Sequence, residues 1–160
     1  MLLVNCAAIS NNSPEAMPRD DPVNVSTAGM MNVFAVNVAA PLKFAALLRP
    51  SLARAKGDVL NISSETGSVA KISKPSKFAY SASKAALNHV TRNLSLHLKS
   101  DGIGVFLCEP GWMRTDMGSK SAMHEPRDVA KWIFSEPAPW KVERSDGFPA
   151  HGRDYDVCPW

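Results

Sequence analysis

With 160 residues, 45% of them apolar, the chain is long enough to bury one substantial core and has the composition of a globular domain. Its formal net charge is only +3 and its Lys and Arg residues are dispersed, which argues against a nucleic-acid-binding protein. We find no uninterrupted run of about eighteen apolar residues and no basic region at the start, so we expect a protein that neither spans a membrane nor is secreted.

The chain contains three cysteines, Cys6, Cys108 and Cys158, which lie far apart in the sequence and lack the short spacings of zinc ligands. Its four histidines show no metal-binding pattern either. We therefore expect free thiols, no metal site and a reducing, cytoplasmic location.

The first elements along the chain are a short apolar strand, Leu2 to Asn5, then a loop and a long apolar helix from about Ser26 to Leu48. Pro41 lies inside that helix and has no amide hydrogen, so the carbonyl of Asn37 loses its usual partner and the helix should bend. A free carbonyl at this point can hold a water molecule. An ordinary kinked core helix would give the same sequence.

A second short strand, Asp58 to Ser63, is rich in branched residues and predicts a buried parallel strand. It delivers Ser64 at its carboxyl end, where the catalytic groups of open α/β sheets lie. A helix from about Phe78 to Lys99 follows. The stripe that we expect this helix to bury against the sheet consists of Ala79, Ala82, Ala86, Val90 and Leu94.

Tyr80 and Lys84 are four residues apart on this predicted helix and therefore share a face. An ammonium group beside the phenol favours the ionised phenol, and lowering the pKa of Tyr80 by about 2 units corresponds to roughly 2.7 kcal/mol. A tyrosine tuned in this way can act as an acid or base at neutral pH. An exposed tyrosine and a solvated lysine match the same short motif, so alone it is weakly specific.

The remaining elements are a strand from Ile103 to Cys108, a turn at Glu109-Pro110-Gly111, a short helix from Pro126 to Phe134 and a final strand after Ser145. The polar stretch Asp116 to Glu125 is either a mobile substrate lid or a plain surface loop. The alternating order of strands and helices predicts an α/β fold with a parallel sheet.

Taken together, these segments resemble the short-chain dehydrogenase/reductase family and, within it, the C-factor-like carbonyl reductase branch. The resemblance covers nearly the whole chain. It is carried by Leu3 to Ile9, Ile62 to Gly67, Tyr80 to Lys84, Pro110 to Gly118 and Cys158-Pro159-Trp160. The fold it implies is the C-terminal portion of a Rossmann-like doubly wound parallel sheet, with three to four strands and flanking helices in a single truncated domain over residues 1–160.

The resemblance also implies a reaction, the transfer of a hydride between the nicotinamide of NADP or NAD and a small-molecule carbonyl or secondary alcohol. Tyr80 would donate the proton, Ser64 would hydrogen-bond the same substrate oxygen, and Lys84 would lower the Tyr80 pKa and reach the cofactor ribose. Asn37 would anchor a water in a proton relay. The cofactor-binding residues that the resemblance implies are Asn5, Cys6, Ala7, Tyr80, Lys84, Pro110, Gly111, Met113 and Thr115.

The chain departs from the family's pattern at two places. It starts on the strand that should be the fourth, so the glycine-rich turn that holds the pyrophosphate is missing and cofactor binding is expected to be impaired. Cys6 and Ala8 also replace an asparagine and a glycine of the family's strand-end signature. Because that asparagine ties the central strands together, we expect weaker support for the cofactor here.

The missing neighbour should leave the Leu2 to Asn5 strand as an exposed sheet edge. In the family, the long helix and the Tyr80 helix commonly pair across a dimer interface, so a homodimer is expected. Two functions remain open at this point. One is an NAD(P)-dependent oxidoreductase, and the other is a catalytically incompetent truncated remnant that acts, if at all, as a dimerisation partner.

Overall fold

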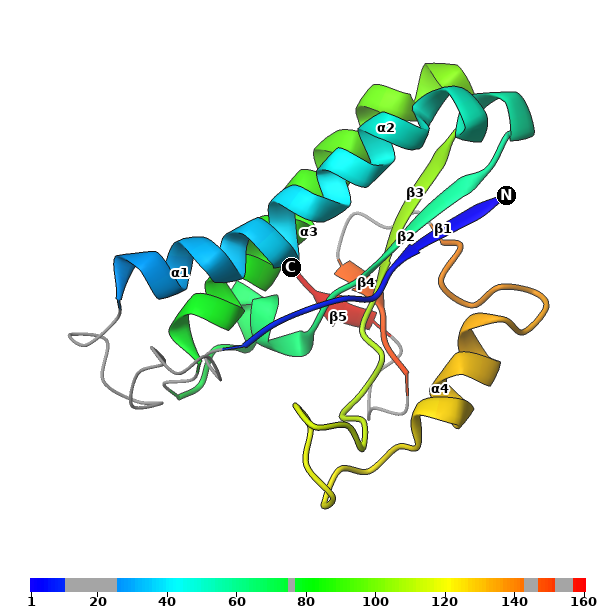
Figure 1. Cartoon of the computed structure of the whole chain (residues 1–160). Helices are drawn as coiled ribbons and strands as arrows, with labels where there is room; N and C mark the ends of the chain where they lie inside the picture. Colours follow the sequence, from blue (N-terminus) through cyan, green and yellow to red (C-terminus); the bar gives the residue numbers. More distant parts are fainter. Residues whose placement is uncertain (11–25, 75–76, 143–146, 152–156) are drawn as a thin grey trace.

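A parallel sheet forms the centre of the computed structural model, which describes residues 1–10, 26–74, 77–142, 147–151 and 157–160. Its three strands are β1 (Leu2–Asn5), β2 (Asp58–Ile62) and β3 (Gly104–Cys108), in the order β1-β2-β3 (Figure 1). All pairs are parallel. The predicted α/β fold with a parallel sheet is therefore confirmed, and β1 lies at the edge of the sheet as expected.

The alternation of side chains along the strands produces two apolar layers, one on each face of the sheet. Val59 and Val105 are neighbours in the register and face the long helices, where they pack with Leu52. Leu60 and its neighbour Phe106 face the other way, toward the helix near the C-terminus. Figure 1 shows the same arrangement, with α2 and α3 on one side of the sheet and α4 on the other.

The predicted long helix consists of α1 (Thr27–Phe34), a π-helical turn (Ala35–Ala39) and α2 (Ala40–Ala55). The irregularity falls just before Pro41, where the sequence predicted a bend. The helix ends later than the predicted Leu48 and runs through Pro50. Leu52 is fully buried against the sheet, and this packing offsets the hydrogen bond that proline cannot make.

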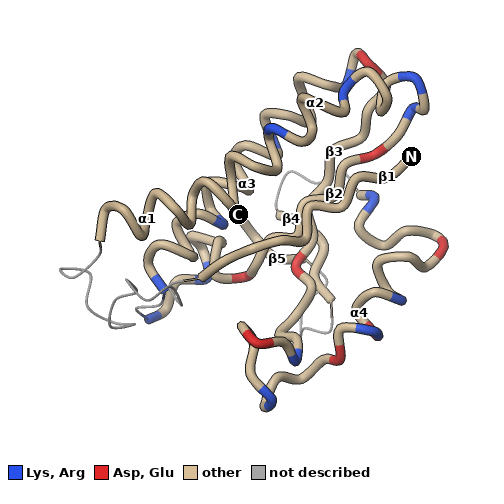
Figure 2. Tube along the Cα trace, in the orientation of Figure 1, with Lys and Arg blue, Asp and Glu red and all other residues tan. Residues whose placement is uncertain are grey.

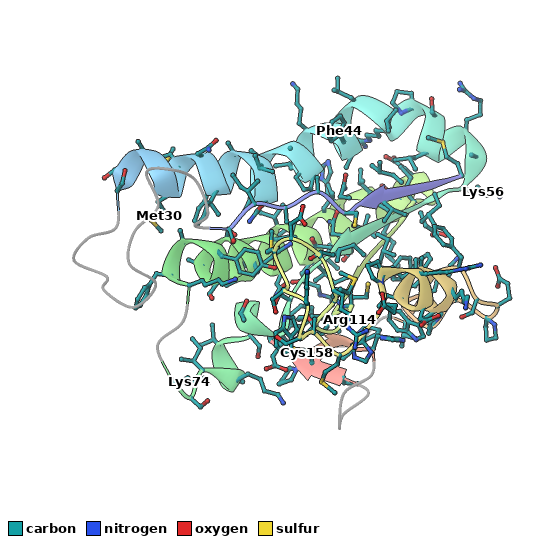
Figure 3. The ribbon with its side chains drawn as sticks, turned by 60° about the horizontal axis from the view of Figure 1, so that its bottom comes forward. Met30, Phe44, Lys56, Lys74, Arg114 and Cys158 are labelled. Atoms are coloured by element: carbon teal, nitrogen blue, oxygen red, sulfur yellow. The ribbon has the colours of Figure 1, made fainter. Side chains whose placement is uncertain are left out.

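By length and composition, the helical segment Thr27–Ala55 could also cross a membrane, with a mean hydropathy of 1.6 in its most apolar window. It was not expected from the sequence because polar residues such as Asn32 and Asn37 interrupt the apolar run. In the structure this helix covers one face of the sheet, although only 22% of that window is buried. Phe44 lies on its outer side, away from the sheet, and is 51% exposed (Figure 3).

Helix α3 (Phe78–Leu98) lies beside α2 on the same face, but it buries a different stripe from the predicted one. Of the predicted stripe only Ala79 is buried. The buried residues of α3 are Ala79, Ser83, Lys84, Leu87, Asn88, Thr91 and Leu98. Polar residues occupy this inner stripe because each finds a hydrogen-bond partner across the core, which removes the cost of burying them.

The C-terminal part contains α4 (Pro126–Ile133) and an antiparallel pair, β4 (Gly147–Pro149) and β5 (Val157–Pro159). The final segment therefore supplies two short strands where one was predicted. The chain after β4 runs beside the end of β3 through a parallel bridge between Glu109 and Ala150. This bridge is the nearest approach to the predicted fourth strand of the parallel sheet.

Charged residues lie on helices, loops and strand ends of the described part of the chain, and those on α2 and α3 are all basic (Figure 2). The ion pairs are local or link neighbouring elements, such as Arg49 with Asp101 at 2.6 Å and Lys141 with Asp58 at 2.9 Å. One of the basic residues of α2, Arg49, is thus paired with the segment that follows α3.

Candidate active site

The carboxyl ends of the three parallel strands bring most of the predicted site residues to one edge of the sheet. β1 ends at Asn5, followed by Cys6 and Ala7, which are exposed. β2 ends just before Ser64, and the turn after β3 holds Pro110-Gly111. Helix α3 contributes Tyr80 and Lys84 from the adjacent layer. The sheet topology therefore brings together site residues that are spread over more than one hundred positions of the sequence.

Ser64 stands at the start of a short 3₁₀ turn, Glu65–Gly67, and its hydroxyl accepts the amide hydrogen of Thr66 at 3.3 Å. Gly67 lets this turn pack tightly on α3, because an added Cβ would lie 2.8 Å from the Cβ of Lys84. The Ser64 hydroxyl also lies near enough to the phenol of Tyr80 to act on its pKa. The two residues expected to hold one substrate oxygen are thus neighbours.

Burial raises the pKa of Tyr80 to about 12, while the Ser64 hydrogen bond acts in the opposite direction and the negative charge of Glu109 adds to the rise. The expectation of a lowered Tyr80 pKa is therefore wrong, because burial raises it. Spacing along the helix could show that the two residues share a face, but it could not show how deeply the phenol is buried.

Lys84 is almost fully buried, and its ammonium nitrogen donates to the carbonyl of Ile62 at 2.7 Å. The same nitrogen lies 5.6 Å from the centre of the Tyr80 ring. Burial lowers the pKa of Lys84 to about 8, and nearby Cys6 and Glu109 act in the opposite direction. The lysine is therefore held beneath the strand end instead of extending into solvent.

Asn37 lies in the π-helical turn and is almost completely buried. Its amide oxygen accepts from the Ile9 amide at 2.9 Å, and its amide nitrogen donates to the Ile9 carbonyl at 2.9 Å and to the Ser83 hydroxyl at 3.0 Å. Ser83 in turn donates to the carbonyl of Tyr80. Asn37 thereby connects the loop after β1 to the helix that carries Tyr80.

A cross-strand connection is present beside Cys6, the residue that replaces a family asparagine. Asn5 donates to Asn61 of β2 at 2.7 Å, and Asn61 donates to Thr91 of α3 at 2.8 Å. This chain of side-chain hydrogen bonds ties β1, β2 and α3 together. Asn5 therefore supplies the cross-strand connection, while Cys6 is left exposed at the strand end.

The turn after β3 places Pro110 and Gly111 in buried positions, with Gly111 at a φ of +78°. Beyond it, Met113 packs against the apolar layer that contains Ile62. Thr115 is exposed, and its hydroxyl accepts the amide hydrogen of Gly118 at 3.1 Å. Pro110 and Gly111 thus lie at the strand end, whereas Thr115 closes a local turn.

The stretch that was expected to be a lid or a surface loop is fastened to the segment before it. His124 pairs with Met113 through a parallel bridge, and Arg114 donates to the Ala122 carbonyl at 2.8 Å and to Glu125 at 2.5 Å. Figure 3 shows Arg114 within this loop region. Trp112, whose carbonyl accepts the amide hydrogen of His124 at 3.0 Å, is 45% exposed.

Three polar residues of this region were not singled out from the sequence. Ser63 donates to Asn88, Ser83 joins Asn37 to α3, and the buried carboxylate of Glu109 accepts two backbone amide hydrogens. A carboxylate directly before Pro-Gly at the end of a buried strand was the available signal for Glu109. Within the described residues, no group of three or more His, Cys, Asp or Glu side chains is placed to hold a metal ion.

Comparison with known families gives a match to the model of the short chain dehydrogenases over residues 1–126. Among curated proteins, the C-signal protein of Myxococcus xanthus is 36% identical over 100 residues, which cover 62% of this chain and 60% of that protein. FixR of Bradyrhizobium diazoefficiens is 35% identical over 144 residues, which cover 82% of this chain and 51% of that protein. The matches therefore span between half and two thirds of the relatives' length.

Two solved structures of carbonyl reductases share the fold over 99% of this chain. Carbonyl reductase Sniffer of D. melanogaster has a TM-score of 0.82 and 26% identity, and 64% of its length is covered. The NADPH-bound carbonyl reductase from chicken fatty liver has a TM-score of 0.81 and 25% identity, and 65% of its length is covered.

Proposed function

Because the chain belongs to the short-chain dehydrogenase family, we propose that it functions in the nicotinamide-dependent interconversion of a small carbonyl compound and a secondary alcohol. The observation that carries this proposal is the convergence of Ser64, Tyr80 and Lys84 at the carboxyl edge of the sheet. These side chains supply a proton donor, a second hydrogen-bond donor and a nearby cation around one position, the arrangement that carbonyl reduction requires.

The residues at this edge fit a nicotinamide cofactor, either NADP or NAD. Cys6 and Ala7 are exposed at the end of β1, and the turn at Pro110-Gly111 lies at the end of β3, on the same edge of the sheet. With Asn5, Pro110, Met113 and Thr115, these residues would hold the nicotinamide end of the cofactor. When bound, the nicotinamide supplies or accepts the hydride.

The chain's own residues would supply the proton that the carbonyl oxygen takes up during reduction. With its pKa at about 12, the phenol of Tyr80 is protonated at neutral pH, so it carries the proton that would pass to the oxygen of a carbonyl being reduced. Ser64 donates a hydrogen bond to the same oxygen, and such a preorganised donor is worth about 3 kcal/mol where negative charge develops. Asn37 holds Tyr80's helix in place through Ser83.

Exposed apolar side chains on the long helix support a homodimer as part of this proposal. Met31, Leu42, Phe44 and Leu47 are between 42% and 65% exposed. Pairing this face with a second copy would remove it from water, which favours association by about 25 cal/mol per Å² of apolar surface. The free thiols of Cys6 and Cys108 support a reducing, cytoplasmic location.

Cofactor titration and turnover test the proposal together. The purified chain is titrated with NADPH and with NADH while nicotinamide fluorescence is followed, and then assayed with a panel of aldehydes and ketones. We expect binding and turnover in the wild type. The Tyr80→Phe variant should bind the cofactor as the wild type does but lose at least about a hundredfold in kcat. No binding at millimolar cofactor would favour a catalytically incompetent remnant.

A further inference from the structure

The carboxylate of Glu109 connects two loops at the proposed active site. One oxygen accepts the amide hydrogen of Glu65 at 2.7 Å, in the turn that begins at Ser64. The other accepts the amide hydrogen of Gly111 at 3.1 Å. The residue is only 2% exposed. A single buried side chain thus fixes the serine turn relative to the turn after β3.

The backbone of Glu109 is held equally firmly. Its amide donates to the Pro149 carbonyl at 2.8 Å, and its carbonyl accepts from the His151 amide at 2.9 Å. These two bonds attach the end of β3 to the chain that follows β4. Because backbone and side chain are both fixed, the carboxylate has a defined position and cannot swing into solvent.

The two side-chain bonds require an acceptor at both carboxyl oxygens, which a carboxylate provides and a glutamine side chain does not. The charge also reaches the groups on neighbouring elements. It acts on Tyr80 and Lys84 of α3 and on Cys108 of β3, and Cys6 after β1 acts on the same lysine. Within the described residues, two further titratable residues, Glu65 and His151, bond Glu109 through their backbone amides.

We propose that Glu109 is a positioning residue of this active site, whose buried carboxylate joins the Ser64 turn to the Gly111 turn and sets the electrostatic environment of Lys84 and Tyr80. The inference rests on the proposed function for its catalytic meaning. It assigns two separable effects to one residue. The hydrogen bonds fix geometry, and the negative charge stabilises the protonated forms of the lysine and the phenol.

Lys84 is the better reporter of the charge effect because its pKa, about 8, lies in a convenient range. The lysine side chains are labelled with ¹³C and titrated by NMR, and the Lys84 signal is assigned by its absence in Lys84→Met. In Glu109→Gln we expect the Lys84 midpoint to fall by about one pH unit, since a nearby negative charge favours the ammonium form. An unchanged or raised midpoint would overturn the electrostatic part.

Two further variants separate charge from geometry. Glu109→Asp keeps the charge but shortens the side chain, so the Lys84 midpoint should stay close to the wild-type value. Glu136→Gln removes an exposed carboxylate that is absent from the charges acting on Lys84, and it should leave the midpoint unchanged. A drop in Glu136→Gln equal to that in Glu109→Gln would show a general charge effect and contradict the proposal.

The hydrogen-bond part is tested on the wild-type chain, so it does not depend on whether a variant folds. Amide hydrogen exchange should show the Glu65 and Gly111 amides protected although both lie outside the strands. Rapid exchange at either amide would overturn the bridge. If the wild type turns over substrate, Glu109→Gln should lower kcat about tenfold, the rate equivalent of one lost hydrogen bond. If it does not, the proposed function fails while the titration and exchange still decide the role of Glu109.

Discussion

The Nζ atom of Lys84 lies 2.7 Å from the carbonyl oxygen of Ile62, so its ammonium group is held inside the protein beneath the end of β2. This contact places the cation between the sheet and the Tyr80 helix, where water is largely excluded. The low pKa of Lys84 results from that placement, and it makes the stability of the chain depend on pH.

The first prediction concerns this pH dependence. Lys84 has a pKa of about 8 in the folded chain against 10.5 for a fully solvated lysine, so between these values the unfolded chain binds a proton that the folded chain does not. The contribution of Lys84 to the free energy of unfolding is therefore highest above pH 10.5, where Lys84 is neutral in both states, and it falls as the pH drops to 8. The free energy of unfolding of the wild type, minus that of Lys84→Met, should therefore be about 2–3 kcal/mol lower at about pH 7.5 than at about pH 10.5.

Urea unfolding followed by tryptophan fluorescence measures this difference at each pH. Taking the difference between the two chains cancels the titration of Cys108, whose pKa is raised by burial in both. A difference that stays constant with pH would show that Lys84 is not desolvated in the folded chain.

Asn37→Ala should destabilise the protein by about 1–3 kcal/mol, because the Ile9 backbone would lose two hydrogen bonds and Ser83 one. Asn32→Ala is a matched control on the same helical segment, since Asn32 is exposed. It should change stability by less than about 0.5 kcal/mol. Equal effects in chemical denaturation would contradict the connecting role of Asn37.

Gly111→Ala should cost at least about 2 kcal/mol, because it adds a side chain at positive φ and in a crowded place. The new Cβ would lie 2.6 Å from the His124 ring and 3.0 Å from the His151 carbonyl oxygen. Gly29→Ala, inside α1, should instead stabilise by about 0.5–1 kcal/mol, because the new Cβ would make only an ordinary contact with the Ser26 side chain at 3.7 Å. Thermal unfolding of both variants checks the opposite signs, and a mild effect at Gly111 would argue against a crowded, left-handed turn at this position.

Ser64→Ala should lower kcat about a hundredfold while cofactor affinity changes little, because its hydroxyl acts on the substrate oxygen as charge develops. Ser121→Ala removes an exposed hydroxyl in the loop after β3 and should leave kcat unchanged. Steady-state kinetics at saturating cofactor separates the two. A loss confined to KM in Ser64→Ala would mean that the hydroxyl serves ground-state binding only.

Apolar runs, and the Gly and Pro residues between them, were enough to predict most elements of the fold. A strand inside a parallel sheet, such as Asp58–Ile62, is almost continuously buried and therefore forms such a run. The motif around Tyr80 and the serine after β2 pointed to the site by resemblance. The irregular turn before Pro41 followed from a missing amide hydrogen. These features are local in sequence, and their physical causes can be read from a few neighbouring residues.

What could not be predicted depends on contacts between distant parts of the chain. The buried face of α3 is polar because Ser83 meets Asn37 and Thr91 meets Asn61, and helical periodicity alone favoured an alanine stripe. The raised pKa of Tyr80 follows from burial, which spacing does not reveal. Glu109 was passed over for the same reason, because its two amide partners lie on different loops.

β1 lies at the lateral edge of the sheet, whereas the proposed active site lies where the strands end. An additional strand would join β1 sideways, along the hydrogen-bonding direction, whereas the reactive side chains are presented at the perpendicular boundary where the strands stop. Lateral extension of the sheet, by a longer form of the chain or by a second polypeptide, can therefore proceed without displacing Ser64, Tyr80 or Lys84.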